Sequence, residues 1–344
     1  MIELCTFLRM TVMQNGMQIG RRRSMTIFKK FVTDIYIVSW ALFKVLIPTL
    51  IVVKIAEMAG AVYWLNVAMA PIVTMIGLPA DMAIVLTTTM LTNPYAGLML
   101  ISAMPSAASL SVAQTTIIAS FMLFAHSLPV EAAITRNAGL RVGVTLAVRV
   151  GAAILFCALL NLFFHQFNML GATARMHLPQ FDVTPGLLQW GIDQVKGLVF
   201  IQVVIVVLII GLELLRWIGA ERLIQKMMHP ILVLVGIGSR ASTIVIVGLT
   251  LGLGFGGGLM IKDVRQGMIP AQAAVGSLVL INLYHSVFED TAVLMLLGPS
   301  LFYILVVRGI FSLILTYVII RLLALLSEPN YDRFVVNTKA FGAN

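Results

Sequence analysis

Charged residues are scarce in this chain. Lys and Arg number 23 and Asp and Glu 14 among 344 residues, so 11% of the sequence is charged, against about 25% in average soluble domains. Hydrophobic residues make up 60%, and the mean hydropathy is +1.01. Several apolar stretches reach about eighteen residues, enough to cross a bilayer as a helix. The composition therefore excludes an ordinary soluble domain and indicates an all-α polytopic membrane protein in contact with the lipid bilayer.

Cysteine is nearly absent too, and the sequence lacks the common catalytic motifs. Cys5 and Cys157 are far apart and neither belongs to a CxxC pair, which excludes a disulfide framework or a cysteine metal site. His126 and Ser127 are adjacent, so their side chains diverge, and no nucleophile-elbow pattern surrounds them. We therefore expect no enzymatic activity and no cofactor.

Positive charge exceeds negative charge, and the formal net charge is +9. Much of the excess flanks apolar stretches, at Arg21 to Arg23, Lys29 and Lys30, and again at Arg216, Arg222 and Lys226. Cytoplasmic loops of membrane proteins gather positive charge in this way, so we expect a multi-pass protein with a cytoplasmic N-terminus. No separate basic domain is present, which argues against nucleic-acid binding.

A His-Ser-acid element occurs twice. Residues 123–131 read LFAHSLPVE and residues 282–290 read NLYHSVFED, so a shift of 159 positions places His126 on His285. The same shift, without a gap, superposes further pairs: Pro71 and Pro230, Gly77 and Gly236, Gly97 and Gly256, Ser127 and Ser286, Glu131 and Asp290, Gly139 and Gly298, and Arg149 and Arg308. We interpret the chain as two homologous membrane repeats.

The repeats divide the chain into five parts. These are a basic N-terminal segment (1–30), repeat 1 (31–165), an inter-repeat loop (166–189), repeat 2 (190–326) and a polar tail (327–344). One basic cluster, from Arg21 to Lys30, precedes the first span of repeat 1. The other, from Arg216 to Lys226, follows the first span of repeat 2. If both clusters are cytoplasmic, the repeats are inverted. Either three or four crossings per repeat fit the sequence, and it leaves homo-oligomerisation open.

Each repeat also interrupts a long apolar segment. The stretch 82–104 contains Thr92-Asn93-Pro94, and its counterpart is the glycine-rich run 248–258. Proline removes a helical hydrogen bond, so we expect broken helices or re-entrant hairpins. Paired broken segments indicate a transporter binding site, although close helix packing explains the glycines equally well. Pro129 similarly predicts a turn before a short helix that ends near Asn137.

Buried ionisable residues are the candidate functional groups, since each costs about 2.5–3.5 kcal/mol on insertion. In one interpretation, Arg149 pairs with Glu131, and Arg308 with Asp290 or Glu289, only to neutralise charge. In the other, these acids couple transport to H⁺ or a cation while the arginines hold them. The side chains and backbone expected to bind solute are those of His126, Ser127, His285, Ser286, Asn93, Gly256, Gly257 and Asn282. The ligand types suit zinc or iron, but no local His/acid spacing is present, so we predict no metal site.

Three segments resemble one known family: LTNPYAG (91–97), HSLPVE (126–131) and HSVFED (285–290). They are similar to the gate-domain, or nucleoside-recognition, proteins of the bacterial inner membrane. The resemblance covers residues 40–165 and 195–325. Relatives of that family include concentrative nucleoside transporters, the membrane region of the ferrous-iron permease B and spore maturation proteins A and B. The resemblance implies a transport-like helical body with inverted repeats and does not fix the substrate. Our first hypothesis is an inner-membrane secondary transporter or permease of a nucleoside-like or other polar metabolite. The alternatives are a divalent-metal permease and a non-transporting assembly scaffold.

Overall fold

The computed structural model describes residues 32–341, except 34, 37–38, 41–42, 45, 49, 53, 57, 180–185, 235–236 and 238. The described residues form helices and no strand, and two isolated bridges join Ser111 to Thr173 and Leu140 to Val336. The predicted all-α fold is confirmed. The basic segment 1–30 lies outside the described residues. Residues 35–53, where we predict the first span of repeat 1, are described only in part.

Several helices of the two halves begin at equivalent positions. The first half contains α2 (Ala61–Met75), α3 (Met82–Leu91), α4 (Pro94–Ser102), α5 (Val112–Ala125), α6 (Leu128–Asn137) and α7 (Val142–Gln166). The second half contains α8 (Leu187–Trp217), α9 (Ala220–Leu234), α10 (Ser239–Leu251), α11 (Leu253–Arg265), α12 (Ala271–Leu283), α13 (Glu289–Leu294) and α14 (Arg308–Leu323). The first residues of α2 and α9, of α4 and α11, and of α5 and α12 are each 159 positions apart, the offset of the predicted repeats; the duplication itself stays a prediction.

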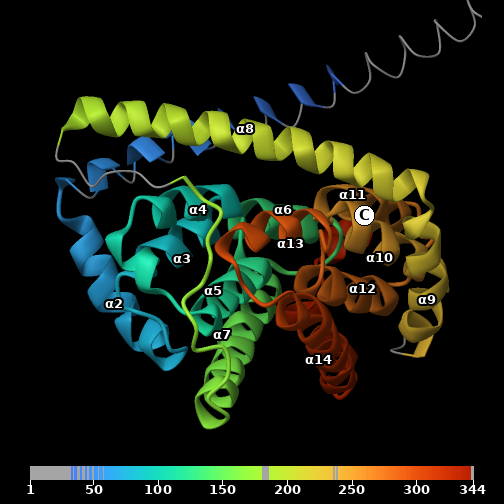
Figure 1. Cartoon of the computed structure of the whole chain (residues 1–344). Helices are drawn as coiled ribbons and strands as arrows, with labels where there is room; N and C mark the ends of the chain where they lie inside the picture. The colour runs from blue at the N-terminus through green and yellow to red at the C-terminus, as the bar shows by residue number, and fades with distance from the viewer. Residues whose placement is uncertain are drawn as a thin grey trace, which may run out of the picture.

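The halves lie side by side beneath α8. In Figure 1, α2, α3 and α4 lie on the left and α9, α10 and α11 on the right, with α5 and α12 between them. The long helix α8 runs across the top of this view. Most residues of α5 and α12 are buried, which explains why both helices are apolar on all faces.

The end of α7 packs against the start of the helical segment that contains α14. The rings of Phe164 and Tyr303 lie 4.8 Å apart. At the other end, Val144 of α7 and Leu322 of α14 line one groove. The two helices are therefore antiparallel, the orientation that inverted repeats require of equivalent elements.

Among the described residues, four helical stretches are long and apolar enough to cross a membrane: Val112–Asn137, Val142–Gln166, Leu187–Gly211 and Phe302–Leu323. The first of these stretches contains both α5 and α6. Helices α3, α10 and α12 are apolar but have only 10 to 13 residues, which is about 15–20 Å at 1.5 Å per residue. None of these three spans a bilayer alone.

Both predicted breaks are present. Helix α3 ends at Leu91 and α4 begins at Pro94, where Asn93 caps the new helix by accepting a hydrogen bond from Ala96 N at 3.0 Å. Proline at the first position and Asn at the cap are favourable at a helix start. In the second half, Gly252 separates α10 from α11 with φ +89°, a conformation that favours glycine.

The glycine run provides close contact between α10 and α11. A Cβ at Gly256 would clash with the backbone of Gly248, whereas a Cβ at Gly258 would meet nothing within 4 Å. The two positions belong to the same helix, α11, so they form a matched pair for testing how much this contact contributes.

We expect Gly256→Ala to lower the thermal midpoint of the detergent-purified protein, because overpacking costs about 1–3 kcal/mol. Gly258→Ala should leave the midpoint unchanged or raise it, since alanine is the better helix former by about 1 kcal/mol. The measurement is thermal unfolding of both variants beside the parent. Equal midpoints for the two variants would contradict the close α10–α11 contact.

Candidate functional site

The first His-Ser element forms the turn between α5 and α6. His126 follows the last residue of α5, and Ser127 then adopts φ +51°. Its N–H donates to Thr89 O at 3.1 Å and its hydroxyl to Thr92 O at 2.6 Å, so the turn is tied to the broken end of α3. Ser286 has φ +45° at the equivalent position. Left-handed conformations cost a non-glycine residue about 1–2 kcal/mol, and such strain concentrates at functional sites.

The two histidines meet at the centre of the molecule. Their Nε2 atoms are 3.2 Å apart and both side chains are buried. His126 Nδ1 lies 2.8 Å from Met122 O, and His285 Nδ1 lies 2.9 Å from Ile281 O. A backbone carbonyl only accepts, so we assign a proton to each Nδ1, and each neutral ring presents its Nε2 lone pair to the other. Two lone pairs at this distance repel unless a proton or another cation lies between them.

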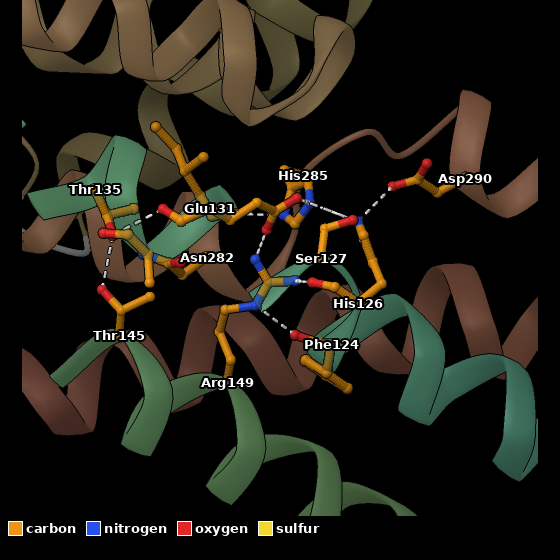
Figure 2. Close-up of polar contacts among 12 residues, drawn as sticks. Phe124, His126, Ser127, Glu131, Thr135, Thr145, Arg149, Asn282, His285 and Asp290 are labelled. Atoms are coloured by element: carbon orange, nitrogen blue, oxygen red, sulfur yellow. Dashed lines mark hydrogen bonds and ion pairs between the residues drawn. The ribbon is translucent and has the colours of Figure 1, made fainter. Parts of the chain in front are cut away.

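Two carboxylates complete the cluster. Glu131 Oε1 lies 3.3 Å from His126 Nε2 and 3.1 Å from His285 Nε2. Asp290 Oδ2 lies 3.5 Å from His126 Nε2. Figure 2 shows Glu131 between the histidine pair and Arg149, with Asp290 beside His126. The predicted convergence of the two His-Ser-acid elements is therefore present for the histidines and the acids.

Arg149 holds the first acid. Its Nη1 forms an ion pair with Glu131, its Nε donates to Phe124 O at 2.8 Å and its Nη2 donates to His126 O at 2.9 Å. The guanidinium is fully buried. It closes the end of α5, where carbonyl groups have no helical partner. The predicted pairing of Arg149 with Glu131 is confirmed.

The predicted pairing of Arg308 with Asp290 or Glu289 is wrong. Arg308 is fully buried, yet none of its three guanidinium nitrogens has a hydrogen-bond partner within the described residues. The guanidinium instead packs over the Tyr284 ring, 4.6 Å from the centroid. A cation–π contact of this kind contributes about 2 kcal/mol or more when desolvated.

Two differences between the halves explain why Arg149 pairs with an acid whereas Arg308 does not. Asp290 is one methylene shorter than Glu131, and it approaches His126 instead. A π-helical segment, Phe302–Val307, directly precedes Arg308. Its carbonyl at Leu305 accepts a hydrogen bond from the Tyr284 hydroxyl at 2.8 Å. Gly309 leaves room for this ring, because a Cβ there would lie 3.0 Å from it.

The other residues expected to bind solute have local partners or helix contacts. Asn93 caps α4, Gly256 packs on the backbone of α10, and a Cβ at Gly257 would press on the Ile134 side chain. Asn282 donates from Nδ2 to Leu278 O at 2.8 Å, while its Oδ1 is buried without a partner. Solute contact by these residues stays a prediction.

Sequence reasoning missed Tyr284 and the bond between Thr135 and Thr145, whose hydroxyls lie 2.8 Å apart and join α6 to α7. Tyr284 falls opposite Ala125 under the 159-residue shift. A large polar aromatic facing alanine, one position before the second histidine, is the signal that could have identified it.

Four candidate spans among the described residues and a buried charged cluster between broken helices define a multi-pass α-helical membrane protein. No family model matches the chain, and no solved structure matches it. The chain is similar to the uncharacterized membrane protein YvoD of Bacillus subtilis (strain 168), with 28% identity over 288 residues that cover 82% of this chain and 90% of YvoD. The relative supports the membrane assignment.

The two arginines should differ in their contribution to stability. Arg149→Met leaves Glu131 buried without its partner, which should lower the free energy of unfolding by about 3–5 kcal/mol. Arg308→Met removes a buried charge that makes no hydrogen bond, so its cost should be smaller. Thermal or denaturant unfolding in detergent compares the two. Adding Glu131→Gln to Arg149→Met should recover part of the loss, and an equal loss for the two arginine variants would contradict the asymmetry.

Proposed function

We propose that this protein is a secondary transporter or permease of a small polar solute, with the buried histidine pair as the coupling site for a cation. The observation that carries the proposal is the 3.2 Å approach of His126 Nε2 to His285 Nε2. The proposal includes inverted repeats in the bacterial inner membrane and a cytoplasmic N-terminus.

The position of the pair between the two halves supports transport. His126 belongs to the first half and His285 to the second, so each half contributes one lone pair to the contact. A proton or another cation between them attracts both rings, whereas its release leaves the lone pairs and nearby carboxylates to repel. A cation bound between the histidines therefore favours a shorter separation of the two halves than the empty site does. Alternating access requires such a difference in interaction between conformations.

Two unpartnered polar groups support a polar solute. The Arg308 guanidinium and Asn282 Oδ1 are buried without hydrogen bonds, and an unsatisfied buried group costs about 1–3 kcal/mol, more when charged. An acceptor group on a solute would satisfy Arg308, and a donor group would satisfy Asn282 Oδ1. Nucleosides, nucleobases and organic acids are the classes to test first, and the gate-domain resemblance points to the first two.

A ligand screen tests the proposal. Purified protein is heated with nucleosides, nucleobases and organic acids, and a ligand at 100 times its dissociation constant should stabilise the fold by about 2.7 kcal/mol. If the coupling cation is a proton, the same ligand should drive proton movement into proteoliposomes that contain a pH-sensitive dye. We expect the doubly substituted His126→Ala/His285→Ala protein to lose both responses.

The matched control is His165→Ala, because His165 is exposed near the end of α7. This variant should respond as the parent does. If the folded double variant keeps the thermal shift and the proton movement, the histidine pair is not the coupling site. Absence of solute-driven proton movement for every ligand that binds would contradict proton coupling.

A further inference from the structure

We propose that the histidine pair binds a divalent transition-metal ion of the zinc class, through His126 Nε2, His285 Nε2 and Asp290 Oδ2, with Glu131 Oε1 as the fourth ligand. This inference names the cation of the proposed coupling site and so rests on the proposed function for its role. The binding itself needs only the cluster.

Four of the six distances among the four donor atoms are close to those of a four-coordinate ion. Zinc lies about 2.0–2.1 Å from histidine nitrogen and about 2.0–2.2 Å from carboxylate oxygen, so the ligand atoms of a tetrahedral site are about 3.3–3.5 Å apart. The histidine nitrogens are 3.2 Å apart, and Glu131 Oε1 lies 3.3 and 3.1 Å from them. Asp290 Oδ2 lies 3.5 Å from His126 Nε2, and the donor atoms of the two histidines and Asp290 all lie within 4.8 Å of one another.

The hydrogen bonds around these donor atoms are of the kind that orient metal ligands in proteins. Metal-binding histidines donate their other ring N–H to a carbonyl or carboxylate, which fixes the tautomer and raises basicity. Met122 O and Ile281 O accept these bonds at 2.8 and 2.9 Å. Ligating carboxylates are held in turn, and Arg149 holds Glu131. Both Nε2 lone pairs are therefore directed into the space that the carboxylates face.

The donor set selects the class of ion. Imidazole nitrogen with carboxylate oxygen suits zinc, iron and neighbouring transition metals, whereas Mg²⁺ and Ca²⁺ favour six or more oxygens. The carboxylates of Glu131 and Asp290 lie within 3.5 Å of the histidine nitrogens, where they attract a cation.

Asp290 is the most exposed of the four side chains. It is 14% exposed, against 10% for Glu131, 6% for His126 and 1% for His285, although its Oδ2 atom is itself buried and has no hydrogen-bond partner. The ligands come from α6, α13 and the ends of α5 and α12, so no local sequence spacing reveals them.

The test is metal binding by the full chain in detergent, with any oligohistidine tag removed. Protein stripped with a chelator is titrated with Co²⁺, whose visible absorption reports four-coordinate geometry, and bound Zn²⁺ is then counted by elemental analysis after desalting. We expect one ion per chain. His126→Gln/His285→Gln should abolish binding, and Asp290→Asn should weaken it by at least about tenfold, the lower end of the loss that outer-shell changes produce.

His165→Gln/His177→Gln, which alters two exposed histidines, should bind one ion as the parent does. Asp290→Asn is nearly isosteric, so it decides the question if the histidine variant fails to fold. No stoichiometric uptake by the parent, or uptake unchanged in folded Asp290→Asn, would overturn the metal site and leave a shared proton as the occupant. Metal binding without solute-driven transport would instead refute the proposed function and leave the site standing.

Discussion

The contact between His126 Nε2 and His285 Nε2, at 3.2 Å, is the constraint on which the rest of the structure depends. Two buried neutral imidazoles with facing lone pairs are unstable together unless a positive charge joins them. The chain holds them there by tying each Nδ1 to a carbonyl one helical turn back and by turning the backbone sharply at Ser127 and Ser286. A central site shared by two halves of the chain is the consequence.

The two halves place an arginine at equivalent positions, Arg149 and Arg308, but the two side chains have different partners. In the first half, Arg149 forms an ion pair with Glu131 and donates hydrogen bonds to two backbone carbonyls, so its guanidinium group has partners within the protein. In the second, Arg308 lies over the Tyr284 ring and keeps all three nitrogens without partners. Equal repeats would bind a solute symmetrically, whereas this arrangement leaves the buried donors on one side only. The cation site itself is shared, because each half contributes one histidine and one carboxylate to it.

The sequence predicted the framework well because its signals are local. Pro94 and Gly252 end helices by known backbone effects, and both breaks occur where they were expected. The proximity of His126 and His285 was predicted from a single inference, the repeat with an offset of 159 residues. The Arg308 pairing failed because it depends on a single methylene in Asp290 and on a π-helical segment. Spacing encodes neither of these features, and the metal donor set is divided between segments far apart in the chain.

The central claim is that both histidines keep Nδ1 protonated and direct Nε2 at a shared cation. Nitrogen NMR of ¹⁵N-histidine-labelled protein in nanodiscs tests it most directly, with His126→Gln and His285→Gln used to assign the two rings. We predict Nδ1–H for both residues, with each Nε2 either sharing a proton or bound to metal. An Nε2–H tautomer on either ring, with its Nδ1 unprotonated, would contradict the claim.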